Sequence, residues 1–105
     1  EIYEWLFIKG EGMQDYDKLS EFFKVFADNT RLMILNSLLS GSKCVSGISL
    51  CLNKSQSLIS HQLKYLRDLN LVKVEKDGQT SMYSISDEHI RIILKYGIEH
   101  ISERS

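Results

Sequence analysis

Four side chains near the end of the sequence are of the types that hold a metal ion: Asp87, His89, His100 and Glu103. Imidazole nitrogens and carboxylate oxygens suit zinc, and two of each would complete a closed tetrahedral site. His89 and His100 are eleven positions apart, which on one helix separates them by about three turns and about 16 Å along the axis. One ion therefore cannot contact both histidines of the same chain.

A symmetric dimer would remove this obstacle. If two copies of the last helix pack antiparallel about a twofold axis, the first two ligands of one chain lie beside the last two of the other, and the dimer holds two equivalent sites. Gly97 would allow the two helices to approach closely. The apolar residues between the ligand pairs would form the seam of this dimer: Ile90, Ile93, Leu94, Ile98 and Ile101.

Each of these ligands also has an ordinary structural explanation. Asp87 is well placed to cap the N-terminus of the last helix, and Glu103 near the end of the sequence would usually be solvated. A single surface histidine is ordinarily not a metal ligand. A set of two nitrogens and two oxygens nevertheless fits tetrahedral zinc better than a metal of higher coordination, and cobalt would serve as a substitute. Zinc is therefore the predicted metal.

A second group of side chains has the chemistry of a DNA-binding surface. Ser55 is expected to cap a helix over residues 55–69, and the side chains expected to face inward are Leu58, Ile59, Leu63, Leu66 and Leu69. The other face has hydrogen-bond donors and positive charge, with no acid before Asp68: Gln56, Ser57, Ser60, His61, Lys64 and Arg67. Such a face suits base edges and phosphates, although a charged helix face is often simply solvated.

The distribution of charge agrees with a polyanionic partner. The chain as a whole has a formal net charge of −1. Residues 29–80 nevertheless carry a net charge of +4, from seven basic and three acidic side chains, whereas residues 1–28 carry −4. Neutralisation of phosphates supplies much of the affinity of proteins for nucleic acids. A basic central region in a nearly neutral chain is thus a mild indication of nucleic-acid binding.

The hydrophobic pattern predicts the elements that position these two groups. Besides the helix at 55–69, predicted helices span residues 14–27, 28–39 and 44–51, and a last helix follows Ser86 or Asp87 as its cap. Alternating residues on either side of an Asp77-Gly78 turn predict a β-hairpin over 71–85. This order is that of a mainly α fold with a small β-hairpin, a winged helix-turn-helix that would dimerise through its terminal helices.

Length and composition fit a single domain. The 105 residues, 43% of them hydrophobic, can form one modest core. Residues 13–105 are predicted to be the DNA-binding and dimerisation domain, and residues 1–12 an N-terminal arm or a tag remnant. No apolar run is long enough for a membrane span and the first residues lack a signal-peptide pattern, so we expect a cytoplasmic protein without a membrane partner. Cys44 and Cys51 would then be reduced. The helix at 44–51 could bury either Cys51 or Leu52, and Cys51 is the preferred core residue.

Three blocks of the sequence resemble the ArsR/SmtB family of metal-sensing repressors. One block is residues 26–35, with the sequence Phe-Ala-Asp-Asn-Thr-Arg-Leu-Met-Ile-Leu. It resembles the start of a helix that in this family usually has the sequence Ala-Asp-Pro-Thr-Arg-Leu. Residues 55–66, Ser-Gln-Ser-Leu-Ile-Ser-His-Gln-Leu-Lys-Tyr-Leu, resemble the recognition helix, and residues 71–84 resemble the wing. The resemblance covers about residues 17–103, and consecutive blocks in the correct order make it specific.

The resemblance implies a homodimer that binds double-stranded operator DNA in its apo form and is released when zinc binds. The Asp-x-His and His-x-x-Glu pairs coincide with the zinc ligands of SmtB-type members. It also implies that one ligand, here His100, hydrogen-bonds the backbone near Asn70 and Leu71, at the end of the recognition helix. The residues expected at bases or nearby backbone are Gln56, Ser57, Ser60 and His61, and those expected at phosphates or in the wing are Lys64, Lys76 and Gln79.

One departure from the family bears on the ligand. Arsenic and cadmium sensors of this family carry a Cys-x-Cys on the short third helix, where this chain has Cys44-Val45-Ser46 and lacks the second thiol. A soft-metal site is therefore not expected there. Two alternatives stay open. One is a redox- or sulfur-responsive repressor that uses Cys44 or Cys51. The other is a hydrolase with a metal at Asp87, His89 and Glu103. This alternative is less favoured, because four protein ligands would fill the coordination sphere and leave no position for water.

Overall fold

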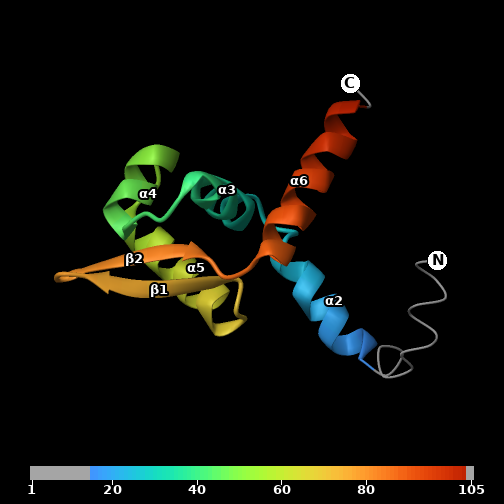
Figure 1. The fold of residues 1–105 in the computed structure, drawn as a ribbon, viewed down its shortest axis with the longest axis horizontal. Helices are drawn as coiled ribbons and strands as arrows, with labels where there is room; N and C mark the ends of the chain where they lie inside the picture. Colours follow the sequence, from blue (N-terminus) through green and yellow to red (C-terminus); the bar gives the residue numbers. More distant parts are fainter. Residues whose placement is uncertain (1–14, 104–105) are drawn as a thin grey trace.

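A helical body carries a small two-stranded hairpin in the computed structural model, which describes residues 15–103 (Figure 1). The elements are α2 (Tyr16–Val25), α3 (Asn29–Ser37), the 3-10 helix η2 (Leu38–Ser40), α4 (Val45–Leu52), α5 (Gln56–Asp68), β1 (Val72–Asp77), β2 (Thr80–Ile85) and α6 (Glu88–Glu103). Each predicted helix and the hairpin are present, with ends that differ by one or two residues. The proposed N-terminal arm, residues 1–12, lies outside the described residues.

The core lies between α3, α4, α5, the base of the hairpin and the start of α6. Asp28 begins α3 by accepting a hydrogen bond from the backbone N–H of Arg31 at 3.0 Å, a cap worth about 1 kcal/mol. The buried side chains among the described residues are all hydrophobic: Val25, Ile34, Leu35, Leu38, Ile48, Ile59, Leu63, Leu66, Leu71, Val72, Ile85, Ile90 and Leu94. Ile90 and Leu94 therefore fix the first half of α6 to the rest of the domain.

The helices α4 and α5 form a helix-turn-helix. Asn53 ends α4 with a φ of 56°, in the left-handed region, and the N–H of Lys54 donates to the carbonyl of Ser49 at 3.2 Å. Ser55 then caps α5, as predicted, by accepting from the N–H of Leu58 at 3.1 Å. The two helices are thus joined by a tight turn in which the side chain of one residue starts the second helix.

The inward face of α5 is narrower than the sequence predicts. Ile59, Leu63 and Leu66 are fully buried, as expected. Leu58 and Leu69 are 36% and 40% exposed, so the prediction that they face the core is wrong. Leu58 is rotated by about 100° around the helix from Ile59, and Leu69 follows the last helical residue as its C-cap.

The hairpin forms the wing. Its strands pair antiparallel up to Asp77 and Thr80, so the tight turn is Gly78-Gln79, one residue later than predicted. Gly78 has a φ of 66°, which glycine adopts without steric cost. The N–H of Lys43 donates to the carbonyl of Tyr83 at 2.9 Å, and the N–H of Tyr83 returns a bond of 2.8 Å. These bonds attach the wing to the residue that precedes the cap of α4.

The helices α2 and α6 lie at the end of the molecule opposite the tip of the hairpin (Figure 1). Both carry large apolar side chains that are exposed: Tyr16, Leu19 and Phe23 on α2, and Ile92, Tyr96, Ile98 and Ile101 on α6. A concentration of such side chains on one part of a surface is typical of an association site. Within residues 15–103, no helix has the length and hydrophobicity that a membrane crossing requires.

Candidate functional site

Asp87 and His89 lie side by side at the start of α6. Asp87 caps the helix, because its Oδ1 atom accepts hydrogen bonds from the N–H groups of His89 at 3.0 Å and Ile90 at 3.4 Å. The Nδ1 atom of His89 lies 3.4 Å from the same oxygen. The His89 side chain is 86% exposed and the Asp87 side chain 53% exposed. The pair thus presents one carboxylate and one imidazole together at the surface.

His100 and Glu103 lie near the other end of α6. Together with Tyr96 and Glu99 they line a shallow depression on the surface of the helix. In residues 15–103 of a single chain, no three His, Cys, Asp or Glu side chains converge as a metal site would require. The structure therefore groups the four predicted ligands into two pairs on one helix and does not bring the two pairs together.

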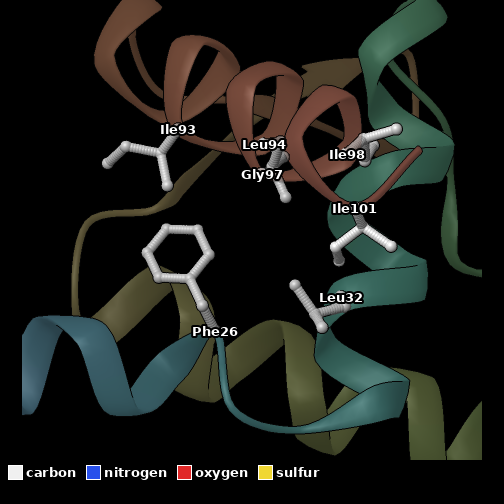
Figure 2. Close-up of a pocket in the computed structure, with 7 residues that line it drawn as sticks. All are labelled: Phe26, Leu32, Ile93, Leu94, Gly97, Ile98 and Ile101. Atoms are coloured by element: carbon white, nitrogen blue, oxygen red, sulfur yellow. The ribbon is translucent and has the colours of Figure 1, made fainter. Parts of the chain in front are cut away.

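An apolar groove lies beside α6, between this helix and the junction of α2 with α3. It has a volume of about 220 Å³ and is lined by Phe26, Leu32, Ile93, Leu94, Gly97, Ile98 and Ile101 (Figure 2). Phe26 and Leu32 face the α6 residues across the groove (Figure 2). Its lining is almost wholly hydrocarbon, and it is open to solvent along one side.

The predicted seam of α6 is only partly at the surface. Ile98 and Ile101 are 48% and 69% exposed, whereas Ile90 and Leu94 are buried in the core of their own chain. The prediction that these last two residues face a partner helix is therefore wrong. A Cβ atom added to Gly97 would meet nothing within 4 Å among the described residues. Packing within the chain therefore does not require glycine at this position.

The polar face of α5 is exposed, as predicted. Its side chains at the surface are Gln56, Ser57, Ser60, His61 and Lys64. Lys64 Nζ forms an ion pair with Asp68 Oδ2 at 3.2 Å, and the two side chains are 77% and 63% exposed. A pair as exposed as this contributes at most about 1 kcal/mol, so a phosphate could readily replace Asp68 as the partner of Lys64.

The two wing residues of the predicted DNA surface are also exposed. Lys76 lies on β1 and Gln79 in the turn of the hairpin. Both residues are at the tip of the hairpin, and this tip lies at the end of the molecule opposite α2 and α6 (Figure 1). The predicted DNA-binding residues and the predicted metal ligands therefore occupy different parts of the domain.

The two thiols are free and differ in their surroundings. Cys51 is exposed, so the prediction that it belongs to the core is wrong. Leu52 packs against the core instead. Cys44 is partly exposed, and its Sγ atom lies 3.2 Å from the hydroxyl of Ser46. This hydrogen bond, together with one from the backbone N–H of Gly47, stabilises the thiolate and lowers the pKa of Cys44.

Two arginines outside the predicted sites, Arg31 and Arg91, connect separate elements. Arg31 Nε donates to the carbonyl of Val25 at 3.0 Å, and its guanidinium lies 4.6 Å from the centre of the Tyr65 ring. Arg31 thereby joins the end of α2 to α5. Arg91 donates to the carbonyl of Leu39, 52 residues earlier, at 2.8 Å and joins α6 to η2. The Thr-Arg-Leu motif marks Arg31 in the sequence, but no local pattern marks Arg91.

Ser86, one of the two candidate caps of α6, has a different role from the one considered. Its hydroxyl donates to the carbonyl of Asn70 at 2.7 Å, and its N–H donates to the carbonyl of Leu71 at 3.1 Å. These are the backbone groups near which the family resemblance predicts a bond from His100. In the single chain, Ser86 already contacts both of them, and the bond from His100 stays a prediction.

Comparison with known proteins identifies relatives across most of the chain. Residues 28–74 match the family described as bacterial regulatory protein, arsR family. An uncharacterised HTH-type transcriptional regulator of Methanocaldococcus jannaschii, MJ1325, is 44% identical over 84 residues, which cover 79% of this chain and 94% of that protein. A transcriptional repressor SmtB homolog of Synechocystis is 33% identical over 86 residues, which cover 82% of this chain and 65% of that protein.

A solved structure supports the fold. The homodimeric winged helix-turn-helix DNA-binding domain Mb0332 of Mycobacterium bovis superimposes with a TM-score of 0.78 over 84% of this chain and 82% of that chain, at 24% identity. At this identity the likeness confirms the winged helix-turn-helix fold alone. The sequence relatives are described as transcriptional regulators and not as enzymes. The family match over residues 28–74 and the match to MJ1325 over 94% of its length together show that this chain belongs to the ArsR family of bacterial regulatory proteins.

Proposed function

We propose that this protein is a homodimeric transcriptional repressor that binds operator DNA in its metal-free form and is released when zinc binds across the dimer. One observation carries the proposal: a single helix, α6, presents a carboxylate and imidazole pair near each of its ends. The Synechocystis relative, a transcriptional repressor by its description, supports the regulatory part of the proposal. Such a repressor acts on the genome in the cytoplasm.

Binding to DNA would use α5 as the recognition helix. Its exposed polar side chains can exchange hydrogen bonds with base edges in a major groove, and Lys64 and the wing residues Lys76 and Gln79 would meet the backbone beside it. In a twofold dimer, the two copies of α5 would enter successive major grooves of an inverted repeat. The net charge of +4 over residues 29–80 favours this polyanionic partner.

Dimerisation would bury the apolar faces of α2 and α6. Leu19 and Phe23 on α2, and Ile98 and Ile101 on α6, are about half exposed or more, which is costly for large hydrophobic side chains. A twofold contact lets one surface bury itself against a copy of itself. A Cβ atom at Gly97 would meet no other element of residues 15–103 within 4 Å, so this position would leave room for a second helix.

The chemistry of the four side chains fits zinc. Each pair offers one imidazole nitrogen and one carboxylate, so pairs from two chains supply the four ligands of a tetrahedral ion. His89 Nδ1 and Asp87 Oδ1 are 3.4 Å apart, close to the separation of about 3.3 Å between two ligand atoms that each lie about 2.0 Å from a tetrahedral zinc. When bound, zinc would supply coordination bonds that join the first pair of one chain to the second pair of the other.

Release from DNA would follow from a change in the arrangement of the two protomers. A ligand shifts an equilibrium between two states only by binding one of them more tightly, and the coupling is reciprocal. The joined ligand pairs would fix how the two α6 helices lie against each other. Because Ile90 and Leu94 hold α6 in the core, the rest of each domain would follow. In the zinc-bound arrangement, the two α5 helices would no longer match the spacing of the grooves.

A second candidate function is a redox- or sulfur-responsive repressor of the same family. The lowered pKa of Cys44 and the exposure of Cys51 favour it, because the thiolate is the reactive form of cysteine and must be reached from solvent. In this alternative, α6 would be a dimer seam without a metal. Thiol oxidation, rather than zinc, would then change the affinity for DNA.

The two candidates differ in what releases the protein from DNA. The metal-free protein would first be used to select a binding duplex from a pool of random DNA sequences. Fluorescence anisotropy would then measure the affinity of the protein for this duplex. Zinc at two ions per dimer should weaken binding by about 5- to 150-fold, the usual range for coupled sites. Unchanged affinity at saturating zinc would contradict the proposal. Release by an oxidant that Cys44→Ser abolishes would favour the alternative.

Two variants of α6 separate metal binding from other effects. His89→Ala should bind the duplex like the wild type and no longer respond to zinc, because each site has lost a ligand. Glu99→Gln is the matched control, since Glu99 lies beside His100 and Glu103 but outside the predicted ligand set. It should respond as the wild type does. Loss of the response in Glu99→Gln with a retained response in His89→Ala would show that the ligand set is wrong.

A further inference from the structure

Ser86 joins the start of α6 to the end of α5. Its hydroxyl donates to the carbonyl of Asn70 at 2.7 Å, and its backbone N–H donates to the carbonyl of Leu71 at 3.1 Å. Ser86 lies between the last residue of β2 and the cap of α6. These two bonds therefore fasten the connection between the wing and α6 to the end of the recognition helix.

Asn70 and Leu71 are the residues that terminate α5. Asn70 has a φ of 66°, in the left-handed region, and the N–H of Leu71 donates to the carbonyl of Leu66 at 2.8 Å, which closes the end of the helix. Leu71 is 1% exposed. The backbone N–H groups of this dipeptide are bonded to α5 and its carbonyls to Ser86. A displacement of Ser86 would therefore act directly on the last turn of α5.

The residue after Ser86 is the first candidate metal ligand. The Oδ1 atom of Asp87 accepts from the N–H groups of His89 and Ile90, so this ligand pair and the first turn of α6 form one hydrogen-bonded unit. Adjacent Cα atoms are about 3.8 Å apart, so Asp87 cannot move far without moving Ser86. The second ligand pair, His100 and Glu103, lies about 16 Å further along α6. Of the two pairs, Asp87 and His89 are therefore the closer to the bond between Ser86 and the end of α5 in the same chain.

We propose that Ser86 is a positioning residue that transmits metal binding at Asp87 and His89 to the recognition helix of the same chain. This inference rests on the proposed function, in which zinc lowers the affinity for DNA, and it adds a route for that effect. The route runs from the ligand pair through the Ser86 hydroxyl to the carbonyl of Asn70 and the last turn of α5. Without the hydroxyl, the two helices are less tightly coupled.

The test compares coupling ratios, defined as the Kd for the selected duplex at saturating zinc divided by the Kd without metal. Ser86→Ala should lower this ratio by about two- to tenfold, which corresponds to the net contribution of one hydrogen bond. Its zinc affinity, measured by competition with a chromogenic chelator, should equal that of the wild type. Ser86→Thr keeps a hydroxyl and should keep the ratio. Ser84→Ala, which removes a hydroxyl from β2, should also keep it.

A second readout does not involve DNA. Zinc should shift the amide NMR resonances of residues 66–71 in the wild type and in Ser86→Thr. In Ser86→Ala these shifts should be clearly smaller, because only the backbone bond from Ser86 to Leu71 remains, while the resonances of α6 still shift as in the wild type. These spectra also report whether each variant is folded.

The outcomes separate this inference from the proposed function. A wild-type coupling ratio in folded Ser86→Ala would overturn the role of Ser86 and leave the proposed function standing. Loss of zinc binding in folded Ser86→Ala would also overturn it, because Ser86 would then build the metal site and not transmit from it. If zinc does not change the affinity of the wild type for DNA, the proposed function fails and the role of Ser86 fails with it.

Discussion

Truncation of Ile101 should weaken the dimer strongly. Ile101 lies on α6 at the edge of the apolar groove and is 69% exposed (Figure 2). Full burial of an isoleucine side chain contributes about 1.5–3 kcal/mol, so covering the exposed 69% contributes about 1–2 kcal/mol. A twofold interface contains each residue twice. Ile101→Ala should therefore cost up to about 2–4 kcal/mol, which raises the dimer Kd by about 30- to 700-fold.

Sedimentation equilibrium over a series of protein concentrations measures this Kd. Leu50→Ala is the matched control, because Leu50 is 84% exposed but lies on α4, away from the proposed interface. Its truncation should leave the dimer unchanged. Thermal unfolding would show that both variants keep the fold. An unchanged Kd in Ile101→Ala, or an equal loss in both variants, would refute the burial of this face of α6 in a dimer.

The assignments on α5 and α4 lead to further predictions. Gln56→Ala should relax sequence preference, whereas Lys64→Ala should weaken binding to all duplexes and flatten the salt slope by about 1; equal loss on specific and random DNA in Gln56→Ala would remove Gln56 from base reading. Cys44→Ser should leave zinc-driven release intact, and a folded variant without that response would make Cys44 part of the sensor. Because the Ser46 hydroxyl lowers the pKa of Cys44, alkylation of this thiol by iodoacetamide should begin at lower pH than in Ser46→Ala. Coincident pH profiles would show that this bond has no such effect.

The elements could be predicted because their signals are local. Ser55 and Asp87 cap their helices through groups only two or three residues away, and such pairs are visible in the sequence. The wrong predictions concern which side chains of a helix face the core, because the helical period alone allows more than one choice. Ile48 and Leu52, four residues apart, share the inward side of α4, and Cys51 between them points outward. Periodicity alone did not decide between Cys51 and Leu52.

The connections between the candidate sites could not be predicted from the sequence. Ser86 and Asn70 are 16 residues apart, and Arg91 reaches a carbonyl 52 residues away. No repeating pattern encodes contacts of this kind, because they depend on how the elements pack. The ligand pairs are the opposite case: their spacing on one helix is fixed by the helical rise, and it predicts that a single ion needs a second chain.

The measurement that tests the central proposal most directly counts zinc ions in a dimer with His89→Ala in one chain and His100→Ala in the other. If the sites are shared between chains, one site of this heterodimer loses both histidines and the other keeps all four ligands. Each variant homodimer instead loses one ligand from both of its sites. Two affinity tags isolate the heterodimer, and competition titration gives its stoichiometry. We predict one tightly bound zinc in the heterodimer, two in the wild type and none in either variant homodimer. Two tight ions in either homodimer, or none in the heterodimer when the wild type binds two, would contradict a site shared across the dimer.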